Sequence, residues 1–230
     1  MPSNSLKLIS SMATREVLGE MVPAYQRNSA QAVSADAAGG LDVAKRVQAG
    51  EAVDVVILSA NAIDKLIADG KLLPGSRMDL VKSGIGVAVR AGGHTPEIAS
   101  EEAVKQAVLA AQTLSYSTGP SGVYLESLFE RWGILEQIRS RIVVPPPGVP
   151  VGSLVAAGAA ELGFQQLSEL LNLPGVAIIG SLPPAIQHIT IFSGGISVGC
   201  GDPAAARALL SFLASPVVAG IKQRYGMEAA

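Results

Sequence analysis

The sequence predicts an α/β protein built of two lobes, and three observations lead to this prediction. Apolar runs alternate with helical patterns from the start of the chain, which is typical of parallel strands covered by helices on both faces. The alternation breaks at residues 73–76 and resumes after residue 100, so a second α/β unit follows the first. Hydrophobic residues make up 49% of the 230 residues but aromatic residues only 4%, which suits a core of aliphatic side chains.

The first unit alternates regularly between strand and helix. The expected strands are residues 5–10, 31–36 and 53–58, and the expected helices are residues 14–27, 41–49 and 60–69. After the break at residues 73–76, alternating Leu, Val and Ile residues predict one long β-type stretch over residues 79–90.

The second unit repeats the alternation less regularly and leads into a helical C-terminus. The expected elements are helix 100–111, strand 114–117, helix 122–132, strand 141–144, helix 150–157, strand 161–165, strand 176–179 and strand 187–197. Helices are expected over 203–214 and 216–225, separated at Pro216, since proline suits the first turn of a helix.

The C-terminal helices have no strand of their own beside them, so their simplest packing is back onto the first unit. Lobe 1 is therefore expected to be discontinuous, with residues 1–83 and 194–230, and lobe 2 to span residues 84–193. Two chain crossings between lobes predict a hinge and a cleft between them.

Composition excludes several classes of function. The formal net charge is −2 with scattered positive charges, and no basic stripe or aromatic platform indicates nucleic-acid binding. No apolar run is long enough to span a membrane. The single Cys200 excludes an internal disulfide, and the distance along the chain between His94 and His188 excludes zinc-ligand spacing. We therefore expect no metal and no cofactor.

The beginning of the chain bears on its location. Residues 1–5 lead almost directly into the first strand, without the charged and apolar regions of a secretory signal. The protein is expected to be cytoplasmic if this sequence is the native full length, and periplasmic if a signal peptide was removed. In the second case an ABC transporter permease would be a partner. The sequence leaves the oligomeric state open.

Four times, an apolar run ends in a cluster of small residues and a helical pattern follows at once. Ligands of open α/β sheets bind at the carboxyl ends of the strands, and a helix N-terminus favours an anion. The sequence therefore predicts a site for a small anionic ligand. The expected contacts in lobe 1 are Ser10, Ser11, Thr14, Arg15, Gly39, Gly40 and Ser59.

The fourth occurrence is in the second lobe, at residues 117–122. These residues do not form a P-loop, because no Gly-Lys-Ser/Thr follows, and their glycine spacing is not that of a nucleophile elbow. Gln165 and Gln166 follow a buried strand, where adjacent amides need partners. The amides of Val151 and its neighbour begin another helix and can point at the site. The expected contacts in lobe 2 are Ser117, Thr118, Ser121, Val151, Gln165 and Gln166.

Plainer interpretations compete with some of these assignments. The hydroxyls of Ser10, Ser11 and Thr14 suit an ordinary helix N-cap, although one cap needs only one residue. Arg15 is either a surface side chain or a partner for a ligand carboxylate, which its planar guanidinium fits bidentately. No catalytic residue is identified.

Several stretches in order resemble a known family. They are residues 47–56 and 62–66, Thr118-Gly119-Pro120-Ser121-Gly122, residues 159–168 and residues 202–216, ending at Tyr225-Gly226. Together they resemble the type II periplasmic binding proteins and, among these, the molybdate-binding (extracellular solute-binding) proteins. The chain is also similar to a subgroup associated with aconitate isomerisation. The resemblance implies two Rossmann-like lobes with a hinge and an interdomain cleft.

The resemblance also implies an oxyanion site, from which this chain departs at three positions. Ala13 stands where the family supplies a serine, Gly39-Gly40 replace a Ser pair, and Gln166 replaces a tyrosine. We therefore expect binding of a small carboxylate in the cleft, as in solute-binding proteins. One alternative is an intracellular isomerase of an aconitate-like polycarboxylate, with Glu16, Tyr124 and His188 as candidate bases. The other is molybdate or oxyanion binding for ABC transport.

Overall fold

The computed structural model describes residues 5–146 and 148–230. The chain divides into two compact units, which are Met1–Lys82 with Ile191–Ala230, and Ser83–Thr190. We call them the first and the second unit. The lobe limits expected from the sequence, 1–83 with 194–230 and 84–193, stay a prediction, and residues 1–4 and Pro147 lie outside the described part.

The first unit contains a mixed sheet of six strands in the order β10-β4-β9-β3-β1-β2. Its strands are β1 (Leu6–Ser11), β2 (Val33–Ala38), β3 (Val55–Ser59), β4 (Met78–Ser83), β9 (Thr190–Ile196) and β10 (Glu228–Ala229). The strand β1 lies between β2 and β3 and is parallel to both, whereas β9 is antiparallel to β3. Parallel pairing among the described strands of this sheet therefore joins β1, β2 and β3, and the sheet is mixed because β9 runs antiparallel to β3.

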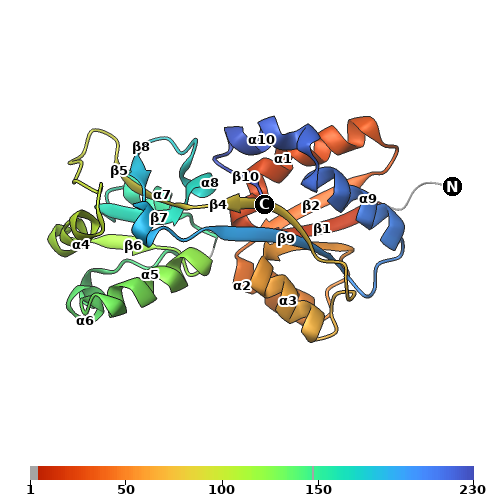
Figure 1. Cartoon of the computed structure of the whole chain (residues 1–230), viewed down its shortest axis with the longest axis horizontal. Helices are drawn as coiled ribbons and strands as arrows, with labels where there is room; N and C mark the ends of the chain where they lie inside the picture. The colour runs from red at the N-terminus through yellow and green to blue at the C-terminus, as the bar shows by residue number, and fades with distance from the viewer. Residues whose placement is uncertain (1–4, 147) are drawn as a thin grey trace. The chain divides into compact units, whose positions relative to one another are not determined.

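Helices cover both faces of this sheet (Figure 1), with α1, α9 and α10 on one face and α2 and α3 on the other. The helices are α1 (Met12–Asn28), α2 (Gly40–Gln48), α3 (Ala60–Ala68), α9 (Pro203–Ala214) and α10 (Ala219–Arg224). Glycines on β9 let the layers on both faces of the sheet pack closely against this strand. A Cβ on Gly194 would lie 2.2 Å from Leu210, and one on Gly195 would lie 2.6 Å from Leu72.

A buried lysine fastens the C-terminal helices to the sheet. Lys222 on α10 is fully buried, and its Nζ donates to the carbonyl oxygens of Leu80 (2.8 Å) and Ala214 (3.4 Å). Burial lowers the pKa of the Lys222 ammonium below its usual range. The unfolded chain therefore binds the proton more tightly than the folded one.

This pKa shift predicts a pH dependence of stability. Protonation of Lys222 is disfavoured in the fold, so stability should rise with pH between the lowered folded pKa and the unfolded value near 10.5. In urea unfolding followed by circular dichroism, the wild type should gain stability relative to Lys222→Met as pH increases from 7 toward 10. If the difference in the free energy of unfolding between the two proteins stayed constant across this pH range, the lowered pKa of Lys222 would be contradicted.

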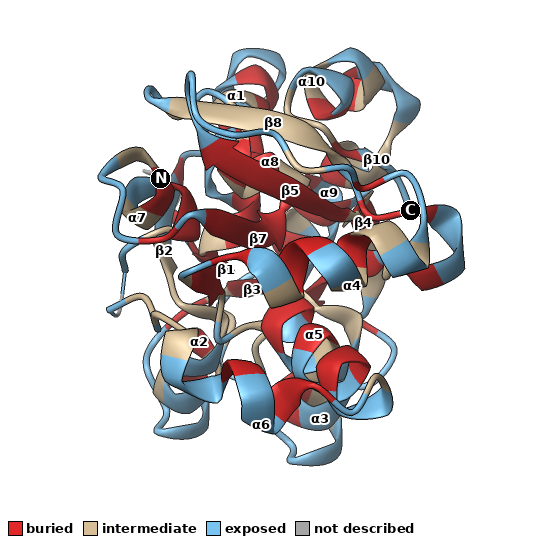
Figure 2. Cartoon of the chain, turned by 90° about the vertical axis from the view of Figure 1, so that its left-hand side faces the viewer, coloured by how far each residue is buried: buried red, intermediate tan, exposed pale blue. Residues whose placement is uncertain are grey.

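The second unit contains a sheet of four strands in the order β6-β7-β5-β8. Its strands are β5 (Ile85–Arg90), β6 (Leu114–Tyr116), β7 (Leu162–Gln166) and β8 (Val176–Ser181), and its helices are α4 (Glu101–Ala110), α5 (Pro120–Arg131), α6 (Leu135–Ile138), α7 (Val151–Ala156) and α8 (Leu167–Leu170). The strands β6 and β7 are parallel, and β5 is antiparallel to β7 and β8. Figure 2 shows β5 and β7 as buried strands under helices with exposed outer faces.

Two expected strands differ in the structure. The stretch 79–90 is two strands separated at Gly84, where a Cβ would lie 3.1 Å from the Gln187 side chain. The expected strand 141–144 is a 3₁₀ turn (Arg139–Arg141) followed by a single bridge between Leu114 and Ile142. Prolines at 145 and 146 follow directly and lack the N–H that would extend this pairing.

Within residues 5–146 and 148–230, no single helix is long and apolar enough to cross a membrane. One pair of successive helices in these residues, Pro203–Ala214 and Pro216–Arg224, has the length and composition of a membrane span when taken together, but the two are bent by 52° relative to each other. Leu209, Leu210 and Leu213 of this pair are fully buried in the core of the first unit. In the same residues, no three His, Cys, Asp or Glu side chains are grouped to hold a metal.

Candidate functional site

Three strand ends of the first unit converge at one edge of its sheet. Ser11 is the N-cap of α1, Gly39 that of α2 and Ser59 that of α3, so each helix begins where β1, β2 or β3 ends. A Cβ on Gly40 would lie 3.8 Å from both the Ser11 Cβ and the Leu58 Cδ2 atoms. The fold thus brings Ser11 and Gly40 together, although they are far apart in the sequence.

The hydroxyls at this edge make long contacts with nearby oxygens. The Ser10 hydroxyl donates to the carbonyl oxygens of Ser11 (3.3 Å) and Asp36 (3.5 Å). The Thr14 hydroxyl donates to the Ser11 carbonyl (3.1 Å) and lies 3.5 Å from Ser11 Oγ. All three side chains are buried. The cap that the plainer interpretation required of Ser11 is absent, since its side chain accepts no capping hydrogen bond.

Two other helices begin with a side-chain cap. Ser100 caps α4 by accepting from Ala103 N (3.1 Å), and Asp202 caps α9 by accepting from Ala205 N (2.9 Å). Among the longer helices, α1, α2, α3 and α5 begin without such a bond in the described residues, and the N-cap residues of α2 and α5 are Gly39 and Gly119, which have no side chain. Within the same residues, the short helices α6, α7, α8 and α10 also begin without a side-chain cap. Helices α1, α2, α3 and α5 therefore begin without a side-chain cap at the strand ends where the sequence predicts an anion.

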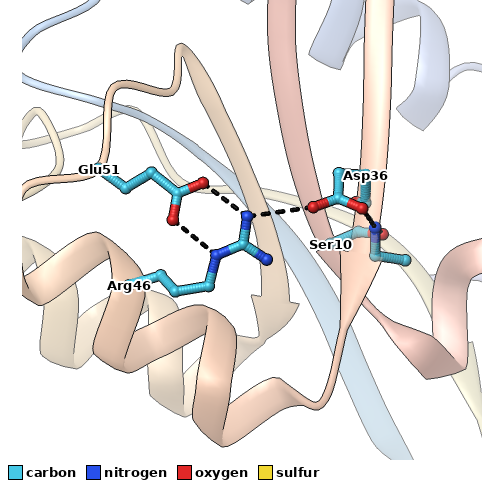
Figure 3. Close-up of polar contacts among 5 residues, drawn as sticks. Ser10, Asp36, Arg46 and Glu51 are labelled. Carbon is cyan, nitrogen blue, oxygen red and sulfur yellow. Dashed lines mark hydrogen bonds and ion pairs between the residues drawn. The ribbon is translucent and has the colours of Figure 1, made fainter. Parts of the chain in front are cut away.

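An ion-pair network fixes the end of β2 against α2 (Figure 3). Arg46 donates from Nε and Nη2 to Glu51 (2.6 Å each) and from Nη2 to Asp36 (3.1 Å). Arg46 lowers the pKa of the Glu51 carboxyl below its usual range. These charges line a cavity of about 390 Å³ but are engaged with one another, so we assign the network a structural role.

Arg15 lies in the first turn of α1 with 60% of its side chain exposed. Its Nε atom is 3.7 Å from a carboxylate oxygen of Glu16, which is itself exposed. The guanidinium is therefore accessible from solvent next to the end of β1. A contact with a ligand at this position stays a prediction.

The second unit has a cavity of about 310 Å³ beside the start of α5. Ser117 and Thr118 from the sequence prediction line it, together with Tyr116, Glu126 and Arg139. The Ser117 and Ser121 hydroxyls are 2.9 Å apart, and the Gly119 amide donates to Ser117 Oγ (3.3 Å). Ser121 is buried at 1% exposure, so of the three predicted hydroxyl residues it is the one turned inward.

Arg139 is a lining residue that sequence reasoning missed. It lies in the 3₁₀ turn after α6, where Nη2 donates to Glu136 (2.5 Å). Tyr116 donates to Glu126 (3.2 Å) in the same cavity, and burial is the main cause that raises the Tyr116 pKa above its usual range. No strand end or motif precedes Arg139, so the sequence carries no signal for its position.

Gln165 and Gln166 end β7 and are both nearly fully buried, at 3% and 2% exposure. Gln165 Nε2 donates to Glu169 (2.8 Å), and Gln166 Nε2 donates to the Thr190 hydroxyl (2.7 Å). Neither amide oxygen has a hydrogen-bond partner in the described residues. Buried acceptors without partners are uncommon. The two free amide oxygens therefore favour either a ligand group that donates a hydrogen bond to them, or a nearby side chain that donates to them once it is protonated.

Glu169 is the second residue that sequence reasoning missed. Burial raises the pKa of its carboxyl to about 7, and the hydrogen bond from Gln165 only partly opposes this shift. The sequence offered one indirect signal, a glutamate one helical turn after a buried strand end. A carboxyl with this pKa exchanges its proton readily at neutral pH.

The other candidate bases are engaged elsewhere. The Tyr124 hydroxyl donates to the Ile186 carbonyl (2.8 Å), and its ring stacks on His188 with centroids 4.6 Å apart. Burial lowers the pKa of His188. Val151, the remaining predicted contact, is fully buried at the first position of α7 and packs with Val155 and Ala160.

Comparisons with known proteins agree with this architecture. The family described as bacterial extracellular solute-binding protein matches residues 6–228. Aconitate isomerase from a Pseudomonas species is 37% identical over 235 residues, covering 99% of this chain and 88% of that protein.

Solved structures share the fold at low sequence identity. The periplasmic molybdate-binding protein of Azotobacter vinelandii superposes with a TM-score of 0.79 at 22% identity, covering 97% of this chain and 98% of that one. The sulfate-binding protein of Mycobacterium tuberculosis gives 0.78 at 13% identity, covering 97% and 86%. The predicted α/β class and the predicted resemblance are therefore confirmed. The chain belongs to the bacterial extracellular solute-binding protein family.

Proposed function

We propose that this chain binds a small polycarboxylate of the aconitate class at the strand ends described above and isomerises it by moving a proton. The observation that supports this most strongly is the 37% identity to an aconitate isomerase, which extends over 99% of the chain. The lack of side-chain caps at the starts of α1, α2, α3 and α5 supports an anionic ligand.

A polycarboxylate suits these groups better than molybdate does. A negative group at a helix N-terminus gains about 0.3–1 kcal/mol, and several such starts serve several carboxylates. Arg15 offers a planar guanidinium for a bidentate contact with one of them. In the family that the sequence resembles, hydroxyls and amides hold molybdate, and Ala13 and Gly39-Gly40 lack the hydroxyls expected at these positions. Enclosure of the ligand between the two lobes stays part of the proposal.

The proposed reaction is a 1,3-proton shift. Aconitate carries a double bond next to a methylene carbon, with a carboxylate on each of three carbons. Removing a methylene proton and returning a proton to the other end of the three-carbon unit moves the double bond. Such a step needs a base within hydrogen-bond reach of the methylene carbon.

The second candidate is a receptor that binds the same carboxylate without turning it over and delivers it to an ABC transporter. The family match supports this alternative, because its description is that of an extracellular solute-binding protein. A receptor of this kind has to be exported. Turnover of the bound ligand distinguishes the two candidates.

Thermal shift with trans-aconitate, citrate, molybdate and sulfate tests the ligand. A ligand at 100 times its Kd stabilises by about 2.7 kcal/mol. For a chain of this size we expect trans-aconitate to raise Tm by about 5–10 °C, and molybdate to leave it unchanged. Arg15→Ala should weaken carboxylate binding about tenfold or more, since a hydrogen bond to a charged group is worth about 1.5–3 kcal/mol.

Arg27→Ala is the matched control, because Arg27 is an exposed arginine in the last turn of the same helix. It should bind like the wild type in calorimetric titration. Proton NMR of trans-aconitate incubated with the protein then measures conversion to the cis isomer. Tight molybdate binding without any response to carboxylates would reject the proposed ligand, and carboxylate binding without conversion would identify a receptor.

A further inference from the structure

The isomerisation proposed above needs a base, and this inference rests on that proposal. We propose that the Glu169 carboxylate takes the proton from the substrate and returns it, and that Gln165 positions this carboxylate. Nothing in the family match or in the resemblance assigns a role to Glu169.

The position of Glu169 follows from the end of β7. The helix α8 begins directly after Gln166, so Glu169 lies within one turn of the strand end. The parallel strand β6 ends beside β7 and leads into Ser117 and Thr118, which line the cavity of the second unit. Gln165 holds the carboxylate through a hydrogen bond of 2.8 Å from Nε2 to Oε1 of Glu169.

The elements packed against α8 supply almost no charge. Those that pack on it most extensively are β5, β7, β8 and α7, and the described residues of β7, β8 and α7 include no titratable side chain. The strand β5 carries only Arg90, at its far end from Ile85, the residue that pairs with Gln166. Burial without a cation raises the pKa of Glu169 to about 7. A general base works best with a pKa near the operating pH.

The amide of Gln165 can serve both protonation states of this base. With Glu169 ionised, Nε2 donates to the carboxylate, and Oε1 remains buried without a partner. Once Glu169 carries the proton it becomes a donor, and half a turn of the amide brings Oε1 to accept from it. The unpartnered oxygen is thus explained as the acceptor for the protonated state.

The proton balance closes without any other reactant. An oxygen of the Glu169 carboxylate takes a proton from the methylene carbon, and the electron pair of the broken C–H bond spreads over the three-carbon unit and its carboxylates. Protonated Glu169, whose proton can exchange with solvent, then gives a proton to the carbon at the other end. The double bond has moved, the substrate keeps its composition and Glu169 is ionised again.

The test compares Glu169→Gln with the wild type and with Glu130→Gln as a matched control. Glu130 is an exposed glutamate on α5. Glu169→Gln keeps a group that can hydrogen-bond Gln165 but cannot accept the proton. We expect kcat for trans-aconitate to fall at least about 100-fold, the Kd to stay within about threefold, and Glu130→Gln to match the wild type. Circular dichroism and Tm check that each variant is folded.

Two further measurements separate a base from a structural residue. The wild-type kcat/KM should rise with pH through an apparent pKa near 7, because the base must be ionised. Gln165→Leu removes the N–H that stabilises the carboxylate, so this limb should shift to higher pH. In D₂O, the wild type should exchange the methylene protons of trans-aconitate for deuterium, and Glu169→Gln should not.

The outcomes distinguish the two proposals. Near wild-type turnover or exchange in folded Glu169→Gln would overturn the role of Glu169 and leave the isomerase proposal standing. A Glu169 carboxyl that titrates below pH 5 by carbon NMR would also overturn it. Binding of trans-aconitate by the wild type with neither turnover nor exchange would overturn both proposals.

Discussion

Replacing Gly122 with alanine is expected to lower the free energy of unfolding by at least about 3 kcal/mol. A Cβ at this position would lie 1.5 Å from the Ser117 carbonyl oxygen and 2.7 Å from its carbon. These are backbone atoms, so the turn that places Ser117 and Thr118 beside α5 has to move. Urea unfolding followed by the fluorescence of Trp132, the single tryptophan, reports this change within the second unit.

Gly19→Ala is the matched control, since it also exchanges glycine for alanine within a helix. No atom lies within 4 Å of the Cβ that would be added at Gly19. Alanine there should stabilise the protein by about 0.5–1 kcal/mol, because glycine loses more backbone entropy on folding. Equal effects of the two substitutions would show that the close approach of residues 117 and 122 is wrong.

Phe129→Ala is expected to destabilise the second unit by about 3–5 kcal/mol, the usual cost of removing a buried aromatic ring. The Phe129 side chain is fully buried, with ring centroids 5.9 Å from Tyr116, 5.8 Å from Trp132 and 6.3 Å from Phe164. Its loss leaves a cavity between α5 and the sheet. Urea unfolding monitored by circular dichroism measures the change.

Phe129→Leu preserves most of the side-chain volume and is the control. It should cost less than about 1.5 kcal/mol, since volume-conserving substitutions in cores are tolerated. If leucine and alanine destabilise equally, the effect comes from lost aromatic contacts and the cavity explanation fails.

Local sequence patterns were sufficient for much of the fold. The strand ends at Ser11, Gly39 and Ser59 could be predicted because a strand, a small residue and a helix start follow one another within a few positions. Order along the chain also indicated the α/β class and the family. The break at Gly84 could not be predicted, because it depends on Gln187, about a hundred residues away.

The candidate site was predictable only where its chemistry is local. Ser117 and Thr118 belong to a recognisable turn, and the structure places them on a cavity wall. Arg139 reaches the same cavity from a short turn without any pattern of its own. Glu169 looks like an ordinary helical glutamate in the sequence, and only the uncharged elements around α8 give it a distinctive pKa.

The strand order of the first unit has a consequence for biosynthesis. The strand β9 lies between β3 and β4, yet it is translated about 110 residues after β4. Until residues 190–196 leave the ribosome, β3 lacks one neighbour and β4 lacks both, since β10 is translated later still, so these strands expose unpaired edges. The second unit is one continuous stretch, Ser83–Thr190, and its whole chain emerges first. The nascent chain therefore completes its middle before its beginning, and β3 and β4 wait for β9 until the whole second unit has been translated.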